Sequence, residues 1–176
     1  MGLGSMIENN TDILTIYDII DIICVGKIKE PYFEDACREY LKRLSRYARV
    51  SVIEVKDEKT PDKQALRLCE KVKEMEAGRV LKHLKDDAFL ICLEINAGEM
   101  SSEAFAAKLG ELSSIGVSCI QFVIGGSLGL HDMVIGRADM HLSFSLMTFP
   151  HRLMRVILLE QIYRAFRIIN NEPYHK

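Results

Sequence analysis

Hydrophobic residues follow two periods along the chain, and these periods predict its elements. Short runs rich in Ile, Val and other apolar residues predict buried strands, and longer stretches with one apolar face predict helices. The predicted strands cover residues 19–25, 50–55, 89–95, 118–124 and 140–143, with a turn expected at 96–99. The predicted helices cover residues 31–45, 61–84, 102–114 and 150–169, and Gly78 favours a break or a boundary within the second.

Strands that alternate with helices are typical of an α/β domain in which helices sandwich a mostly parallel sheet. The run at 89–95 is almost continuously apolar, as expected for a strand that is buried on both faces. In such sheets ligands bind outside the carboxyl ends of the strands. Three loops leave those ends, at 93–98, 125–130 and 143–151, so a ligand site is expected where they meet.

The composition is that of a soluble, globular protein. The 176 residues are 48% hydrophobic and 27% charged, which fits a single domain, predicted at 19–176 after an N-terminal extension at 1–18 of open role. No apolar run approaches the ~18 residues of a membrane span, and the N-terminus lacks the pattern of a signal peptide. Five cysteines without a C-x-x-C pair argue against disulfides, so a cytoplasmic location is expected.

The charge is unevenly distributed. The net charge is −2, yet residues 27–56 carry eight Lys or Arg against five Asp or Glu, and residues 150–176 carry five against two. Two basic segments on an acidic body are consistent with a local footprint for nucleic acid. Ordinary solvated helix faces would give the same pattern, so charge alone leaves both interpretations open.

Several common catalytic and binding motifs are missing. The five histidines show no metal-ligand spacing, so no metal site is expected. Gly125, Gly126 and Gly129 follow a predicted strand and allow close backbone approach, but they do not form a dinucleotide or P-loop fingerprint. A nucleophile elbow is also missing. The glycines are therefore interpreted either as a tight turn or as one wall of a ligand site.

The segment 143–152 has two interpretations. Pro150 suits the first turn of a helix, and the hydroxyls of Ser145 and Thr148 could cap its free N–H groups. Backbone donors, hydroxyls and the pair His151 and Arg152 also converge here, which favours a ligand loop at a helix start.

The last predicted helix and the tail after it carry unusual chemistry. The helix has apolar residues over a wide part of its surface, which suggests burial on two sides and a second subunit. Asn170 and Asn171 tolerate a left-handed conformation and can end the helix. The tail then places Tyr174, His175 and Lys176 together, a combination that is uncommon in a frayed terminus.

Four segments together resemble one family: 25–30 (VGKIKE), 122–130 (FVIGGSLGL), 142–156 (LSFSLMTFPHRLMRV) and 160–176. They resemble the large-subunit ribosomal RNA pseudouridine methyltransferases of the SPOUT superfamily, in their short single-domain form. The resemblance implies a C-terminal deep trefoil knot, an exception among folds. It also implies the cofactor S-adenosylmethionine, a homodimer, and methylation of the imide ring nitrogen of a pseudouridine on the assembled ribosome.

The resemblance also implies roles for individual residues. Leu93, Gly126 and the segment Ser145, Leu146, Met147, Thr148, Phe149 and Pro150 are expected to bind the cofactor. His151, Arg164, Tyr174 and His175 are the catalytic candidates, because removing the imide proton requires a base or stabilising cations. The tail of one subunit is expected to complete the site of the other. Alternatives are a SPOUT methyltransferase of another RNA, such as transfer RNA, and an RNA-binding module without activity.

Overall fold

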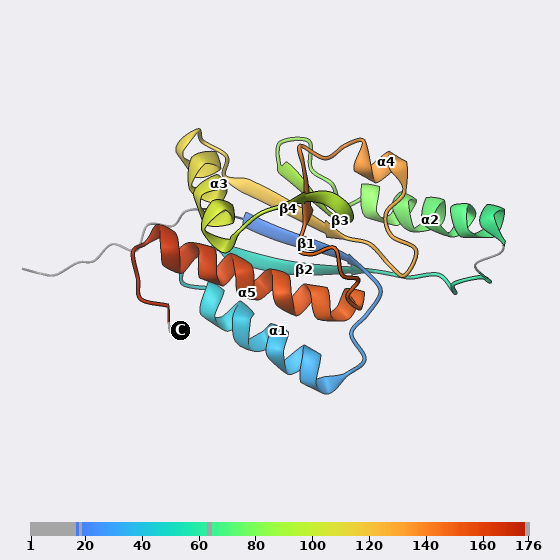
Figure 1. Ribbon diagram of the computed structural model, residues 1–176, viewed down its shortest axis with the longest axis horizontal. Coiled ribbons are helices and arrows are strands. Elements are labelled where there is room, and N and C mark those ends of the chain that lie inside the picture. Colours follow the sequence, from blue (N-terminus) through green and yellow to red (C-terminus); the bar gives the residue numbers. More distant parts are fainter. Residues whose placement is uncertain (1–16, 18, 63–64, 175–176) are drawn as a thin grey trace, which may run out of the picture.

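The computed structural model describes residue 17 and residues 19–62 and 65–174. The predicted extension at 1–18 therefore lies outside the described residues except for Tyr17, as does His175. Five strands alternate with five helices, as drawn in Figure 1. The elements are β1 (Ile19–Val25), α1 (Pro31–Leu44), β2 (Arg49–Val55), α2 (Leu66–Leu81), β3 (Phe89–Glu99), α3 (Ser102–Ser114), β4 (Cys119–Ile124), α4 (Asp132–Ile135), β5 (Met140–Ser143) and α5 (His151–Ile169).

The five strands form one parallel sheet in the order β2-β1-β4-β3-β5, and helices cover both faces. Alternate residues of the central strands point to opposite faces: Ile22 and Phe122 pack under α1, α3 and α5, whereas Ile23 and Val123 pack under α2 and α4. Figure 1 shows α5 lying beside α1 and α3, with α2 and α4 together on the other side. The predicted α/β sandwich is confirmed, and the trefoil knot stays a prediction.

Two predicted boundaries are wrong at α2. The helix begins at Leu66 rather than at Pro61, and the N–H of Ala65 donates to the Asp62 carbonyl in a turn that precedes it. The helix also continues through Gly78. Glycine costs about 1 kcal/mol inside a helix, but its neighbours Ala77 and Val80 are buried against the sheet and stabilise the helical conformation.

The turn predicted at 96–99 is also wrong, because β3 continues to Glu99. Its pairing with β5 is interrupted: Leu93 and Gly98 both face Leu142, so the four residues between them bulge out of the ladder. The bulge lies at the carboxyl end of the sheet. Glu94 and Asn96 lie in this bulge, which is the first of the three loops expected to form a site.

The ends of α3 and α5 follow local rules. The Ser101 hydroxyl accepts from the N–H of Ala104 and caps α3, and Gly116 follows that helix with a φ of 90°. At the end of α5, Asn171 has a φ of 52°, the left-handed conformation expected there. Tyr17, two positions before β1, is buried, packs near the Phe166 ring and donates a hydrogen bond to the Leu109 carbonyl, so it belongs to the core.

Candidate active site

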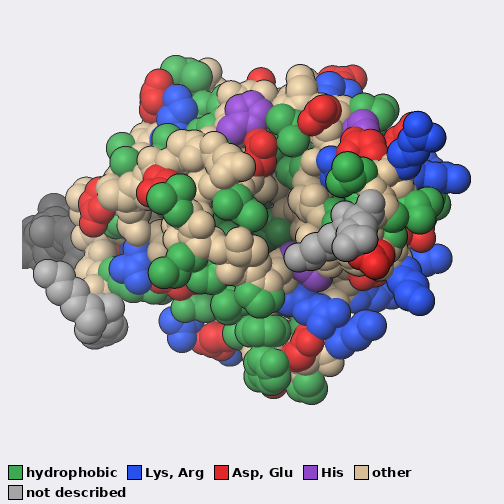
Figure 2. All heavy atoms as spheres, turned by 45° about the vertical axis from the view of Figure 1, so that its right-hand side comes forward, with side chains coloured by type: hydrophobic (Ala, Val, Ile, Leu, Met, Phe, Trp, Pro, Cys, Tyr) green, Lys and Arg blue, Asp and Glu red, His purple; other side chains and the backbone are tan. Residues whose placement is uncertain are grey.

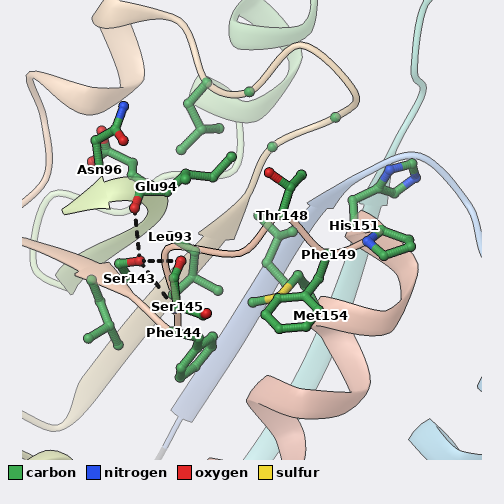
Figure 3. A pocket seen from close by; sticks show the side chains of 18 of the residues that line it. Leu93, Glu94, Asn96, Ser143, Phe144, Ser145, Thr148, Phe149, His151 and Met154 are labelled. Atoms are coloured by element: carbon green, nitrogen blue, oxygen red, sulfur yellow. Dashed lines mark hydrogen bonds between the residues drawn. The ribbon is translucent and has the colours of Figure 1, made fainter. Parts of the chain in front are cut away.

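A cavity of about 650 Å³ opens at the carboxyl edge of the sheet. All three loops predicted to meet there line it: the β3 bulge, the glycine loop 125–130 after β4, and the segment 143–151 that joins β5 to α5. Figure 2 shows this side of the molecule, and Figure 3 shows the lining side chains from close by. A cavity of this size and of mixed apolar and polar lining is typical of a small-molecule or cofactor site.

Ser143 holds the loop between β5 and α5 in place. Its buried hydroxyl lies 3.0 Å from the Ile95 carbonyl and 3.1 Å from the Ser145 carbonyl, and it accepts from the Ser145 N–H. These contacts, dashed in Figure 3, join the loop to the β3 bulge and so connect two walls of the cavity. No separate role was predicted for Ser143, although a serine at the end of an apolar strand is a signal of such a buried contact.

The predicted capping of α5 by hydroxyls is wrong. The Ser145 hydroxyl accepts from the Met147 N–H at 3.0 Å, so it stabilises a turn within the loop and not the helix. Pro150 is the residue before the helix, with a φ of −55° and a ψ of 133°, and α5 has no side-chain cap. The start of α5, and with it the positive end of the helix dipole, lies at the cavity, which His151 and Met154 line.

The glycine loop is tight for two different reasons. A Cβ on Gly125 would lie 2.8 Å from the carbonyl carbon of Gly129, so the backbone of this turn passes too closely for any side chain. A Cβ on Gly126 would instead meet Val25 at 3.0 Å and the buried carboxylate of Glu76 at 3.1 Å. Gly126 lines the cavity, but the space it leaves free faces α2 rather than the cavity.

Glu94 places a carboxylate in the cavity wall. Its Oε1 lies 2.5 Å from Nδ1 of His141, which is on β5. Figure 3 shows Glu94 and Asn96 on one side of the cavity, across from Thr148 and His151. Sequence reasoning gave Glu94 no role, because this residue lies within the predicted apolar strand at 89–95. The bulge that exposes it is a property of the pairing with β5.

His151 begins α5 and lines the opposite side of the cavity. Its Nε2 is buried and has no hydrogen-bond partner among the described residues. Burial lowers the pKa of this imidazole below its usual 6.5, and the neighbouring Arg152 lowers it further, although Asp57 opposes the shift. The ring is therefore neutral near pH 7 and has a nitrogen available to accept a proton.

Arg155 fixes the wall behind His151. Its guanidinium is buried, pairs with the Glu54 carboxylate and donates to the Gly26 carbonyl at 3.0 Å. A Cβ on Gly26 would lie 3.2 Å from Nε2 of His151, so a side chain at this position would crowd the imidazole. The loop after β1 and the start of α5 are thus packed directly on each other.

Two of the catalytic candidates lie at the other end of α5. Arg164 is 13 residues after His151, which corresponds to about 20 Å along a helix. Its guanidinium pairs with Glu160 and lies 4.0 Å from the centroid of the Tyr174 ring. Tyr174 also donates to Glu160, and its pKa is raised to about 12 by burial and by that hydrogen bond. Neither Arg164 nor Tyr174 lines the cavity of its own chain.

The cofactor candidates are placed more uniformly. Leu93, Gly126, Ser145 and the run 147–150 all line the cavity. Leu146 lies outside the lining and is 80% exposed, as the neighbouring Met147 is at 73%. These two residues leave adjacent apolar side chains exposed beside the cavity.

Within the part of the chain that the structure describes, no three His, Cys, Asp or Glu side chains are grouped to hold a metal ion. None of the described helices has the length and apolar character needed to cross a membrane.

The fold and cavity define a parallel α/β protein with a cavity of ligand size where three loops meet at the carboxyl edge of the sheet. The family model described as "Predicted SPOUT methyltransferase" matches residues 19–175. The chain therefore belongs to the SPOUT methyltransferase family, as its sequence motifs indicated.

Relatives with curated names agree with this assignment. The chain is 60% identical to the ribosomal RNA large subunit methyltransferase H of Bifidobacterium animalis subsp. lactis (strain AD011), over 89% of this chain and 99% of that protein. It is 53% identical to the protein of the same name from Clostridium botulinum (strain Kyoto / Type A2), with the same coverage. Among solved structures, a probable methylase family protein from Haemophilus influenzae Rd KW20 matches with a TM-score of 0.51 at 14% identity, over 93% of this chain and 71% of that one, which supports the fold alone.

Proposed function

We propose that this protein uses S-adenosylmethionine to methylate the imide ring nitrogen of a pseudouridine in large-subunit ribosomal RNA, on the assembled ribosome in the cytoplasm. The observation that carries the proposal is the cavity of about 650 Å³ lined by His151, an imidazole whose buried Nε2 lies beside Gly26 and has no hydrogen-bond partner among the described residues. The names of relatives more than 50% identical over nearly their whole length support ribosomal RNA as the substrate.

The cavity fits the cofactor in size and chemistry. Leu93, Phe149 and Met154 offer apolar surface to an adenine ring, and the backbone of the loop 145–150 offers hydrogen-bonding groups to its edge. The Glu94 carboxylate suits the ribose hydroxyls or the positive charges of the cofactor. When bound, the cofactor would supply an electrophilic methyl group on a sulfonium.

The chain's own residues would manage the proton of the target base. The imide proton of a pseudouridine does not leave freely near neutral pH, so methylation needs a base or cations that stabilise the developing anion. His151 meets the first requirement, because burial keeps its imidazole neutral and leaves Nε2 without a competing partner among the described residues. His175 stays a second candidate from the sequence.

A homodimer would bring the remaining candidates to the cavity. Arg164 lies too far along α5 to reach the cavity of its own chain, and Tyr174, which follows that helix, is stacked on the Arg164 guanidinium. A second copy would supply its Arg164, Tyr174 and tail, and it would cover the exposed Leu146 and Met147 at the rim. Tyr174 would then offer an aromatic face on which an unstacked base can lie.

The experiment measures methyl transfer from labelled S-adenosylmethionine to purified large ribosomal subunits, whole ribosomes and transfer RNA, with the modified nucleotide mapped by mass spectrometry. A methylated pseudouridine in large-subunit RNA is the expected product. Methylation of transfer RNA alone would contradict the proposal and favour the rival SPOUT activity. Absence of transfer to every RNA, with the cofactor bound, would favour a binding module.

A mixed dimer tests the shared site. The first subunit is truncated after Pro173 so that Glu172 is kept. Glu172 accepts from the buried Tyr47 hydroxyl and pairs with Arg167, so its loss would damage the fold. The second subunit carries Thr148→Trp, which fills the cavity from an exposed lining position. Sites built from two subunits leave one intact site, so about half the activity per dimer is expected. Sites built within one subunit would leave the mixed dimer inactive.

A further inference from the structure

Four lysines form an exposed ridge at the carboxyl edge of the sheet, next to the cavity. They are Lys27 and Lys29 in the loop after β1, and Lys56 and Lys59 in the loop after β2; we call them the lysine ridge. The two loops lie side by side, because the N–H of Gly26 donates to the Val55 carbonyl at 2.9 Å, directly where the paired strands end. All four side chains are exposed, and none forms an ion pair with a described residue.

The carboxylates around the ridge are already matched by arginines. Three ion pairs use them: Arg152 with Glu30, Arg155 with Glu54, and Arg79 with Glu58. These pairs also anchor the loops, since Arg79 donates to the Lys56 carbonyl and Glu54 accepts from the N–H of Ile28. In the two loop segments 26–30 and 56–59, Asp57 is therefore the one carboxylate without an arginine partner, and it faces four lysine charges. The buried Glu76 beneath accepts from the N–H of Glu58 and is shielded from the surface.

The ridge adjoins the candidate active site. Gly26, which begins the first loop, lies against the imidazole of His151, and Asp57 of the second loop lies against Gly26. Figure 2 shows Lys and Arg side chains gathered to the right and lower right, on the side of the molecule that carries the cavity. A long polyanion whose reactive base enters the cavity would pass over this surface.

We propose that the lysine ridge binds the phosphate backbone of the substrate RNA beside the target nucleotide, an inference that rests on the proposed function. Exposed lysines held on anchored loops provide mobile point charges for phosphates, without reading the bases. The protein as a whole has a net charge of −2, so a local positive surface is needed for RNA to approach this edge. Within the basic segment 27–56, the lysines assigned to RNA binding are therefore those of the two loops, and not the basic residues of α1 between them.

The test compares two double variants that remove the same charge. Lys27→Gln/Lys56→Gln removes two lysines of the ridge, and Lys82→Gln/Lys108→Gln removes two lysines from α3 and the end of α2, away from the cavity. Binding to purified large ribosomal subunits, and to the RNA extracted from them, is measured over a range of salt concentrations. Cofactor affinity is measured by calorimetry for each protein.

The ridge variant should bind both particles more weakly, on the order of 10-fold per lysine at 0.1 M salt, and its salt dependence should decrease by roughly 0.7–0.9 per lost contact. Its cofactor affinity should be unchanged, and the control variant should match the wild type.

Equal binding by wild type and ridge variant would overturn the inference while leaving the proposed function intact. An equal loss in the control variant would also overturn it, since the effect would then be one of total charge. Weaker binding to subunits but not to their RNA would assign the ridge to a ribosomal protein and overturn the RNA contact. A wild-type protein that neither binds nor methylates these particles would overturn both proposals.

Discussion

The two edges of the same sheet use polar residues in opposite ways. At the amino edge, Gln121 is fully buried, and its amide donates to Asp21 and to the His83 carbonyl and accepts from the N–H of Lys85. Lys85 completes the group with an ion pair to Asp21 at 2.7 Å. At the carboxyl edge, His151 keeps a buried nitrogen without a partner among the described residues. The buried amide of Gln121 thus has a partner for both its oxygen and its nitrogen, whereas Nε2 of His151 has none among the described residues.

The largest effect is expected where a group is unpaired. His151→Ala should lower methyl transfer by ~10²–10⁴-fold, the usual loss for an acid–base group. Its thermal midpoint should stay close to that of the wild type, since no hydrogen bond is lost at Nε2. Single-turnover rates with saturating cofactor would measure this.

The amino edge supplies the control for His151. His83 is exposed near the end of α2, so His83→Ala should leave turnover unchanged. If the two variants lose activity equally, or if His151→Ala remains fully active, the base lies elsewhere, and His175 becomes the candidate to test.

The next largest effect is expected at the paired edge, and on stability instead of activity. Gln121→Leu keeps the volume but leaves the His83 carbonyl and the Lys85 N–H without their partner. Unfolding free energy should fall by about 2–4 kcal/mol, because each buried group left unsatisfied costs roughly 1–3 kcal/mol. Urea denaturation would measure the loss. A change in unfolding free energy below about 0.5 kcal/mol would show that the Gln121 network does not stabilise the fold. A loss of specific activity in the folded variant would show that the amino edge also serves catalysis.

The sequence predicted features that depend on local patterns, and it missed features that depend on residues distant along the chain. Strand positions, the parallel sheet and the convergence of three loops follow from periodicity and from general rules for such sheets, and the structure confirms them. The bulge in β3 could not be predicted, because it depends on how Leu93 and Gly98 share one partner on β5. Glu94 was missed for this reason. The direction of the free space at Gly126 depends on the buried Glu76, which is distant in sequence.

Site chemistry at the far end of α5 was predicted in type but not in place. The sequence pointed to Arg164 and Tyr174, and the structure brings these two together with Glu160, away from the cavity of the same chain. No periodicity within one chain reports on what a second copy contributes. Their role in catalysis therefore stays a proposal that the mixed dimer tests.

The smallest effect is expected in the pH dependence of stability, and it again separates the edges. Burial, with Arg152, lowers the pKa of His151 in the folded protein below its usual 6.5. The unfolded chain therefore binds more protons as the pH falls through 6.5, so folding stability should decrease in that direction until the folded imidazole is also protonated. Above pH 6.5 this contribution is absent, because the ring is neutral in both states.

His151→Gln should flatten the slope of unfolding free energy between pH 5 and about 6.5, and urea titrations at several pH values would measure it. Bound cofactor should deepen the wild-type slope if it occupies the cavity beside Nε2, since it would further exclude water from the imidazole. A slope that is the same in wild type and variant would mean that the imidazole is reached by water in the folded protein, and it would remove the physical reason for treating His151 as the base.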